Sequence, residues 1–456
     1  PRPRCARSWT PSGCERYSTR LDTRIFHHPD ADEDAGHYPE SQTIHTLIPV
    51  VETTRFPTTK EPGHMFTSID LFAGAGGLST GLTQAGFRPL FASELHPTYA
   101  AAYALNHRET DVVIDDIRRV DAHEVRSRFG LDRGDLDLLA GGPPCQGFSI
   151  NAPIRSNKDP RNHLFREFLR FTEEFMPRAI LIENVPGLVS FERGGTLTAI
   201  TSSLEQYGYH TSVKILSAAY HGVPQTRWRT IIIGTLTPHN EATVWPQPTH
   251  CAQVRANFSH NFHGKDILEQ PSDISAQAAT TLRDAISDLP RSPKPLNSQD
   301  AIAQYDSAPT SIFQNQVRRG STGVYNHFSS NLSGINLERL SHIPPGGNWT
   351  NIPHSLLPAG MQRARKSDHT KRYGRPRWGD LSGTILTKCD PHWGAFFHPS
   401  EDRVFTVREA ARIQSFPDTY HFTGSLAEQY AEVGNAVPPM LAQAIGTQIA
   451  THLRSA

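Results

Sequence analysis

Short apolar runs that end in glycine, proline or an acidic residue recur along the chain from about residue 65. They are rich in β-branched and aromatic residues, a composition typical of buried strands. These runs predict strands at residues 68–72, 89–94, 112–114, 135–140, 179–182 and 230–234, and a later one at 381–387. Helical patterns are expected at 407–414 and at about 440–449. Together they favour an open α/β sheet, which builds its site at the carboxyl ends of the strands.

The run at 135–140 ends in the sequence GGPPCQG at residues 141–147. Proline fixes φ and lacks an N–H donor, so Pro143 and Pro144 must stop the strand in a rigid loop. Cys145 is then presented at a strand's carboxyl end and is a candidate nucleophile. An isolated cysteine can equally be a small buried hydrophobic residue. This segment alone does not decide between the two.

The run at 68–72 breaks into a glycine-rich loop at 74–77, after which the pattern becomes helical. Glycines here allow a tight turn and close approach of a ligand to the backbone, although Ser79 stands in place of the third glycine of a dinucleotide fingerprint. Glu94 ends the next strand at the usual offset for binding ribose hydroxyls, and Asp116 follows the third strand. Acids without a lysine in the loop suit an adenosine ligand lacking phosphates. S-adenosylmethionine fits this description better than a dinucleotide.

Three further segments place polar residues near strand ends. Glu183 closes the run at 179–182, where a site carboxylate and a helix-capping acid would look alike. Arg227 and Arg229 lie two apart on an extended chain, so their side chains point the same way. Such a pair suits carbonyl or phosphate oxygens, although a solvated strand face has the same pattern. The last segment, GNAVPP at 434–439, leads into the C-terminal helix.

The order of these segments resembles the motif set of the C5-cytosine DNA methyltransferases. The motifs are the glycine loop, Pro-Pro-Cys, Glu-Asn-Val at 183–185, Gln-x-Arg-x-Arg at 225–229 and Gly-Asn-x-Val-Pro-Pro at 434–439. The resemblance covers residues 65 to 449 apart from a variable stretch. It implies a Rossmann-like, S-adenosylmethionine-dependent methyltransferase domain with a mixed, mostly parallel sheet and helices on both faces. A smaller, irregular target-recognition domain is implied as well.

The same resemblance implies catalytic roles for four residues. Cys145 matches the nucleophile that adds to carbon 6 of cytosine, which makes carbon 5 able to accept a methyl group. Glu183 matches the partner of cytosine N3, and Arg227 with Arg229 matches the pair around the target base and the catalytic loop. The base that removes the carbon 5 proton is not identified by the sequence.

Cofactor contacts follow from the resemblance too. Phe72 would stack on the adenine, Glu94 would hold the ribose and Asp116 would reach the adenine amine. The full expected set is Asp70, Phe72, Gly74, Gly76, Gly77, Leu78, Glu94, Asp116, Ile117, Pro143, Leu164, Asn435 and Val437.

Two basic segments are candidates for DNA binding. The target carbon is inaccessible inside a duplex, so the base must be flipped out, and the polar, basic loop at 146–161 suits a mobile lid. Residues 363–377 form a run of cations opposed only by Asp368, as expected for phosphate contacts. Either segment could instead be an ordinary solvated surface. The expected DNA contacts are Gln146, Ser149, Arg363, Arg365, Lys366, Lys371 and Arg372.

Length and charge set the domain organisation. With 456 residues the chain is long enough for two domains and a tail, and its formal net charge of zero does not indicate a nucleic-acid partner. We expect an extension without a hydrophobic core at residues 1–64 and a catalytic and cofactor-binding domain at 65–236. A target-recognition domain is expected at 237–376. Residues 377–456 would carry the late motifs and return to the catalytic domain. The five cysteines show neither zinc spacing nor a disulfide framework.

The sequence therefore predicts a DNA (cytosine-5-)-methyltransferase. We expect a cytoplasmic monomer that acts on double-stranded DNA, without metal or membrane, and protects DNA from a cognate restriction endonuclease encoded nearby. A solitary regulatory enzyme would have the same chemistry. A tRNA methyltransferase on the same scaffold and a non-catalytic DNA-binding repressor are the alternatives. The long variable segment argues against the first, and the complete set of catalytic motif residues against the second.

Overall fold

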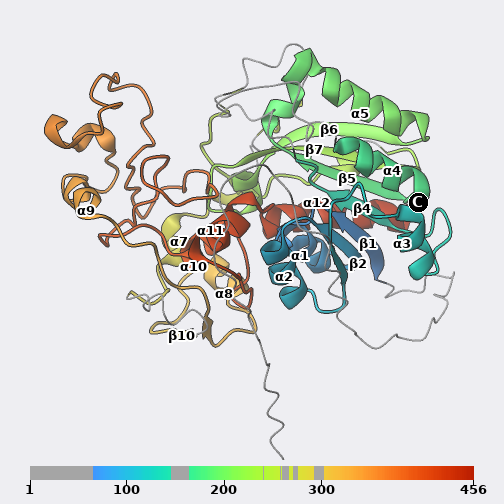
Figure 1. Ribbon diagram of the computed structural model, residues 1–456, viewed down its shortest axis with the longest axis horizontal. Helices are drawn as coiled ribbons and strands as arrows, with labels where there is room; N and C mark the ends of the chain where they lie inside the picture. The colour runs from blue at the N-terminus through green and yellow to red at the C-terminus, as the bar shows by residue number, and fades with distance from the viewer. Residues whose placement is uncertain are drawn as a thin grey trace, which may run out of the picture. The chain divides into compact units, whose positions relative to one another are not determined.

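The computed structural model describes residues 65–144, 164–239, 241–256, 258, 267–270, 276–291 and 302–456. Within them lies a seven-stranded sheet with the order β3-β2-β1-β4-β5-β7-β6 (Figure 1). Strands β1 to β5 pair in parallel, whereas β7 runs antiparallel to both β5 and β6. This confirms the predicted mixed, mostly parallel sheet. The strands are β1 (Phe66–Leu71), β2 (Phe87–Glu94), β3 (Asp111–Ile114), β4 (Leu138–Gly141), β5 (Ala179–Asn184), β6 (His210–Ser217) and β7 (Trp228–Thr235).

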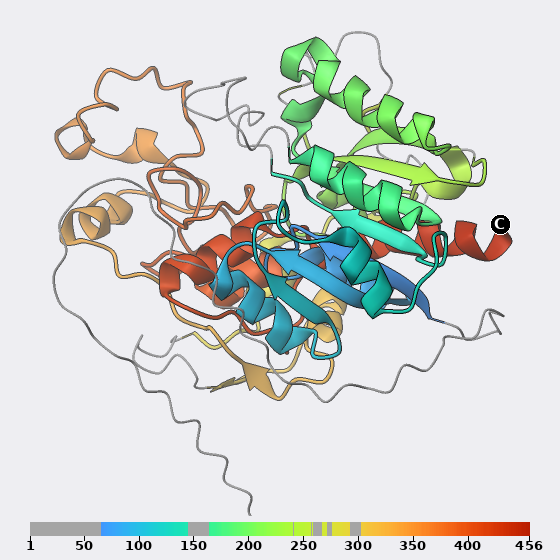
Figure 2. The same ribbon diagram turned by 45° about the vertical axis from the view of Figure 1, so that its right-hand side comes forward.

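Helices cover both faces of this sheet, because successive residues of a buried strand point to opposite sides. Ile180 and Ile182 of β5 pack with residues of α3 (Ala122–Arg128), α4 (Phe165–Phe175) and α5 (Gly195–Gln206). Leu181, between them, packs with residues of α1 (Gly77–Gln84) and α12 (Pro439–Ser455). Figures 1 and 2 show α4 and α5 on one side of the sheet and α1 and α12 on the other. Helix α2 (Pro97–Asn106) lies between β2 and β3 in the sequence.

Glycines on α1 let α12 approach its backbone. A Cβ atom on Gly81 would lie 2.3 Å from the carbonyl oxygen of Pro439, and one on Gly77 would lie 2.5 Å from that of Val437. Real Cβ contacts do not reach such distances, so both positions exclude a side chain. The close packing brings the GNAVPP segment to the carboxyl end of β1, more than 350 residues earlier in the chain.

The described chain between β7 and α12 packs around further hydrophobic clusters. One is shared by α7 (Leu282–Ile286), α8 (Ile312–Val317), α10 (Val407–Ile413) and α11 (Leu426–Asn435). Both α10 and α11 begin with a capping box, which satisfies backbone N–H groups of the first turn. The buried guanidinium of Arg412 in α10 pairs with the carboxylates of Asp288 and Asp418 and so ties α10 to the chain after α7.

A second, separate cluster lies around α9 (Gly334–Ser341) and includes Trp349, Tyr373 and Phe397. Short elements connect these parts: α6 (Glu241–Val244), β8 (His250–Cys251), β9 (Gln277–Ala278), β10 (Ala303–Gln304), β11 (Gly323–Val324), and the 3-10 helices Pro186–Val189, Phe191–Gly194, Ala218–His221, Trp349–Asn351 and His354–Leu356. The expected domain boundaries at 236 and 376 stay predictions. In the part of the chain that is described, no helix is both long and apolar enough to cross a membrane.

Three local features differ from what the sequence predicted. Residues 381–387 form no strand; only Ser382 makes a bridge, to Gln225, and the backbone around it serves as a partner for Thr226 and Arg227. Strand β6 was not expected, because its residues are only partly buried over most of its length and several are polar. The C-terminal helix is also longer than predicted, at Pro439–Ser455. The helix expected at 407–414 is confirmed as α10.

Candidate active site

The carboxyl ends of β1, β2, β4 and β5 surround a pocket of about 600 Å³. Nearly all of the predicted cofactor contacts lie in its wall, although they come from segments far apart in the sequence. The predicted residues that line it are Asp70, Phe72, Gly74, Gly77, Leu78, Glu94, Asp116, Ile117, Pro143, Leu164, Asn435 and Val437. Gly76 does not line it: at φ +90° it turns towards Tyr103, His107 and Tyr420 behind the loop. That position favours glycine for backbone reasons.

Asp70 stands at the end of β1, where its carboxyl group is buried. One oxygen, Oδ2, accepts a hydrogen bond from Ser79 at 2.6 Å, and Ser79 in turn accepts one from Tyr103 at 2.8 Å. The other oxygen, Oδ1, is buried and has no hydrogen-bond partner. Burial raises the pKa of Asp70 to about 7, since the charged form loses its hydration. This carboxyl group is therefore suited to a ligand that supplies a donor or a positive charge.

Glu94, at the end of β2, is held by the glycine loop. Its Oε2 accepts from the backbone N–H of Gly74 and its Oε1 from that of His96, each at 2.8 Å. Burial raises the pKa of Glu94 as well. Asp116 differs, because its hydrogen bonds from Arg118 hold its pKa below the usual range. Glu94 is therefore held by backbone N–H groups, whereas Asp116 is held by a guanidinium group.

Sequence reasoning missed a third buried acid, Glu432 of α11. Its Oε2 accepts from the backbone N–H of Thr423 at 3.2 Å, and its Oε1 is buried without a partner. Burial raises the pKa of Glu432 to about 9. In the sequence, only its position two residues before the GNAVPP segment could have indicated that Glu432 belongs to the site. Other lining residues that were not predicted include Leu95 and Tyr99.

Glu183 and Arg229 meet at one end of the pocket. They belong to the paired strands β5 and β7, whose register places Glu183 opposite Ile231. Glu183 Oε1 lies 2.5 Å from Arg229 Nε, and both side chains are largely buried, with 13% and 12% exposed. An ion pair this sheltered from water holds the carboxylate in one orientation.

The chain that leads to Cys145 lies beside this ion pair. A Cβ atom on Gly142 would stand 3.1 Å from Glu183 Oε2, and the side chain of Asn184 donates to the carbonyl oxygen of Pro143 at 3.1 Å. Pro144 also lines the pocket. Cys145 itself, with Gln146 and Ser149, falls in residues 145–163, outside the described chain. The structure therefore places the backbone at Gly142, three residues before the predicted nucleophile, against the predicted N3 partner Glu183.

Arg227 does not share the pocket with Arg229. Its guanidinium is fully buried and donates to the carbonyl oxygens of Ile385, Gly434 and Ala436 at 3.1, 3.0 and 2.9 Å. These bonds fasten β7 to the segment that carries Asn435. The role of both arginines around the target base and the catalytic loop stays a prediction, although of the two only Arg229 lines the pocket. The carbonyl partners of Arg227 lie about 160 to 210 residues away in sequence, so no local pattern indicated them.

Replacing each arginine by methionine should separate the two roles. Arg227→Met should lower the free energy of unfolding by about 3 kcal/mol, because three buried carbonyl groups lose their donor. Arg229→Met should lower it less and should chiefly reduce kcat. Urea unfolding and methyl-transfer kinetics on both proteins provide the measurement. Unchanged stability in Arg227→Met, combined with a loss of kcat equal to that of Arg229→Met, would instead support a contact with the base.

The predicted DNA contacts outside the loop lie on the surface. Arg363, Arg365, Lys366 and Lys371 are exposed and Arg372 is half-buried. Two neighbouring cations of the same run serve the fold instead: Arg375 donates to the carbonyl oxygen of His398, and Arg377 packs against Gly346. No group of His, Cys, Asp and Glu side chains that could hold a metal ion occurs among the described residues.

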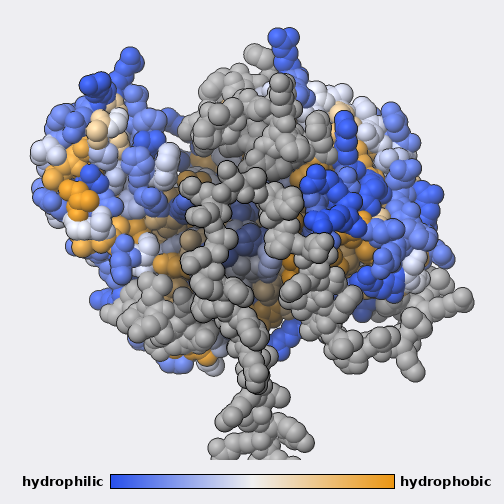
Figure 3. Space-filling model, in the orientation of Figure 1, coloured by the Kyte–Doolittle hydropathy of each residue, from blue (hydrophilic) through white to orange (hydrophobic). Residues whose placement is uncertain are grey.

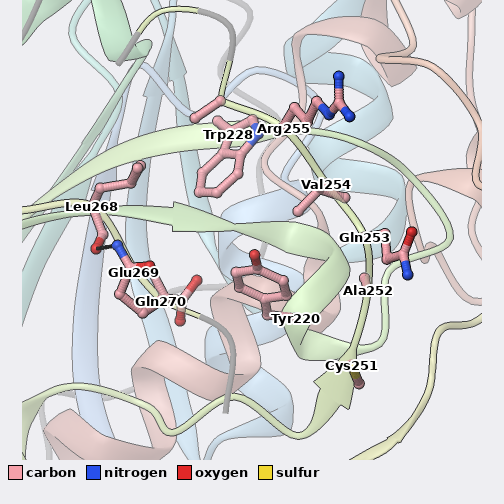
Figure 4. Close-up of a pocket in the computed structure, with 11 residues that line it drawn as sticks. Tyr220, Trp228, Cys251, Ala252, Gln253, Val254, Arg255, Leu268, Glu269 and Gln270 are labelled. Atoms are coloured by element: carbon pink, nitrogen blue, oxygen red, sulfur yellow. Dashed lines mark hydrogen bonds between the residues drawn. The ribbon is translucent and has the colours of Figure 1, made fainter. Parts of the chain in front are cut away.

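A second pocket, of about 450 Å³, is lined by Tyr220 and by Trp228 of β7 (Figure 4). Figure 4 shows Tyr220 and Trp228 between the chain at Cys251–Arg255 and the chain at Leu268–Gln270. Its one acid, Glu269, already accepts from Ser217 N and pairs with His221 at 2.9 Å. None of the predicted site residues lines this pocket.

Comparison with known proteins gives one consistent result. A model described as C-5 cytosine-specific DNA methylase matches residues 66–451. The chain is 35% identical over 428 residues to the type II methyltransferase M.AgeI of Thalassovita gelatinovora, covering 84% of this chain and 98% of that protein. It is 33% identical to the type II methyltransferase M.DdeI of Desulfomicrobium norvegicum, covering 85% and 89%.

A solved structure supports the fold alone. It is described as a DNA modification methyltransferase encoded within a prophage of E. coli, and it aligns with a TM-score of 0.62 at 23% identity. The alignment covers 85% of this chain and 99% of that one.

Proposed function

This chain belongs to the C-5 cytosine-specific DNA methylase family, and we propose that it transfers the methyl group of S-adenosylmethionine to carbon 5 of cytosine in duplex DNA. One observation carries the proposal for the site. Glu183, paired with Arg229, stands beside the backbone that leads to Cys145 and at the end of a pocket lined by buried acids. An acid, a cation and a thiol are the three groups that the addition to cytosine requires.

The residues of the pocket fit S-adenosylmethionine. Asp70 Oδ1 and Glu432 Oε1 are buried oxygens without a partner, and the ligand carries two positive charges, two ribose hydroxyls and an amine. We assign Glu94 to the ribose, Phe72 to the face of the adenine and Asp116 to its amine, while Asn435 and Val437 close the pocket from the C-terminal segment. When bound, the cofactor supplies an electrophilic methyl group.

The protein's own residues activate the base. The thiolate of Cys145 adds to carbon 6, and Glu183 shares a proton with N3 as negative charge develops in the ring. Arg229 holds Glu183 in place and can stabilise charge at the neighbouring O2 carbonyl. Carbon 5, now nucleophilic, would then take the methyl group, and the electron pair of the broken sulfur–methyl bond would stay on the cofactor's sulfur. Loss of the carbon 5 proton to water or a side chain, together with breakage of the bond from sulfur to carbon 6, releases Cys145.

A methyl-transfer assay with the whole protein tests this function. Duplex DNA incubated with the protein and labelled S-adenosylmethionine should become labelled, and bisulfite sequencing should find 5-methylcytosine at one recurring site. tRNA should remain unlabelled, because residues 237–376 are proposed to read duplex sequence. Labelling of tRNA alone would support the alternative tRNA enzyme, and DNA binding without any transfer would support the repressor.

The biological role that we propose is protection of DNA from a cognate restriction endonuclease. Two of the similar proteins, M.AgeI and M.DdeI, are named type II methyltransferases. Action as a cytoplasmic monomer, without a stable complex with the nuclease, is part of the same proposal. Bisulfite sequencing followed by digestion at the methylated site provides its test.

Cofactor affinity should depend on pH through Asp70. Its pKa of about 7 means that the carboxyl group is neutral below that pH and charged above it. A cationic ligand favours the charged form, so affinity should rise about tenfold from pH 6 to pH 8. Glu432, with a pKa of about 9, stays mostly neutral over that range.

Calorimetric titration with S-adenosylmethionine at several pH values measures this effect. The Asp70→Asn protein is the control, because it shares the titration of Glu94 and of the ligand itself. Its affinity should rise less steeply with pH than that of the wild type. Parallel pH profiles of the two proteins would contradict the assignment.

A further inference from the structure

Trp393 is an exposed aromatic residue within a cationic surface. Its side chain is 57% exposed, whereas Trp228, Trp245 and Trp349 are 8%, 1% and 3% exposed. The sequence offered no reason to single it out. Tryptophan is enriched at interfaces, where its ring buries a large apolar area, so an exposed indole is a candidate for contact with a partner.

The backbone fixes Trp393 next to the cationic run. Tyr373 N donates to the carbonyl oxygen of Pro391 at 2.6 Å, and Gly374 N donates to that of Gly394 at 3.3 Å. These bonds join residues 371–374 to the turn at 390–394. Tyr373 is also part of the hydrophobic cluster around α9, so the turn is anchored to a core rather than attached to a free loop.

The guanidinium of Arg372 lies over the indole of Trp393, 5.1 Å from the ring centroid, and the ring of His392 meets it edge-on at 5.1 Å. The flanking segments of the chain carry exposed cations, Arg363, Arg365, Lys366, Lys371 and Lys388, and two exposed acids, Asp368 and Asp390. No hydrogen bond or ion pair occupies the side chains of Arg363, Lys366 or Lys371 within the described chain. Their charges are therefore available to an anionic partner.

We propose that Trp393, with Arg372 over its ring, contacts the bases of duplex DNA, while the surrounding lysines and arginines bind phosphates. An indole offers a flat apolar face that can stack on a base or press between two of them, whereas Lys and Arg bind the backbone charge. The proposal rests on the proposed function and adds to it a base-contacting residue. In Figure 3 hydrophobic and hydrophilic positions are mixed on the surface at α9. Ile335 and Leu337 of α9 are also exposed, but no run of cations flanks them in the sequence.

DNA-binding measurements on four proteins test the proposal. Each protein is titrated, at several salt concentrations, with duplex DNA that contains the site found by bisulfite sequencing. The four proteins are the wild type, Trp393→Ala, Trp393→Phe and the control Leu337→Ala. Trp393→Ala should weaken binding by about 5- to 100-fold, the range for loss of one base–aromatic contact. Trp393→Phe should retain most of the affinity, and Leu337→Ala should match the wild type.

The salt dependence distinguishes a base contact from a phosphate contact. The slope of log affinity against log salt should be unchanged in Trp393→Ala, but should fall by about 2 in the double variant Lys366→Ala/Lys371→Ala, about one for each lost phosphate contact. Thermal unfolding and S-adenosylmethionine binding confirm that each variant is folded. Wild-type affinity in Trp393→Ala, or a reduced salt slope, overturns the proposal while leaving methyl transfer by the wild type intact. Failure of the wild type to bind or methylate duplex DNA would overturn the proposed function instead.

Discussion

Replacing Cys145 by serine should reduce methyl transfer to DNA on the order of 10⁴-fold or more, because a serine hydroxyl is a far weaker nucleophile at neutral pH than a thiolate. Affinity for S-adenosylmethionine should stay close to that of the wild type, since the buried acids of the pocket are untouched. The measurement is the initial rate with labelled cofactor and duplex DNA, together with calorimetric binding of the cofactor.

The matched control is Cys251→Ser, which changes an exposed free cysteine away from the acids of the cofactor pocket. It should methylate like the wild type. A second arm uses duplex DNA that contains 5-fluorocytosine at the target position. Fluorine at carbon 5 cannot leave as a proton does, so the bond between Cys145 and carbon 6 should persist and give a complex that survives denaturation. Normal turnover by Cys145→Ser, or a trapped complex formed by it, would refute the assignment of the nucleophile.

The second large effect is expected at Glu183. Glu183→Gln keeps the size of the side chain but removes the proton that the carboxyl group shares with N3, and kcat should fall by about 10²- to 10⁴-fold. The free energy of unfolding should fall as well, because Arg229 loses the charge of its largely buried partner, although the amide still fits beside Gly142. Single-turnover kinetics under saturating DNA and cofactor separate this loss from any change in binding.

A double-mutant cycle with Arg229 gives the sharper result. Because Glu183 and Arg229 form one ion pair, the loss of kcat in the double variant Glu183→Gln/Arg229→Met should be smaller than the product of the two single losses. Glu205→Gln, on the surface beside Thr211, is the control and should leave kcat unchanged. Full multiplicative losses would mean that the two side chains act independently.

Much of the architecture followed from local patterns. Apolar runs at 89–94, 179–182 and 230–234 became strands β2, β5 and β7, because each is long enough to be buried on both faces and is bounded by residues that break strands. The edge strand β6 was not predicted because its residues are only partly buried over most of its length. Residues 381–387 were wrongly predicted to form a strand: their backbone makes one bridge, at Ser382, and the carbonyl of Ile385 accepts from the side chain of Arg227.

The candidate site divides in the same way. The sequence by itself determined the residue types of the chemistry: a cysteine after two prolines, a glutamate at a strand end and acids along one edge of a sheet. Each of these features is defined by a few residues that are neighbours in the sequence, so the sequence is enough to identify it. The structure alone decided which side chains meet: Arg229 with Glu183, Arg227 with three distant carbonyl groups, Glu432 with the pocket, and Arg372 with Trp393. Those contacts join segments separated by up to about 360 residues, and they arise from tertiary packing, which no local pattern encodes.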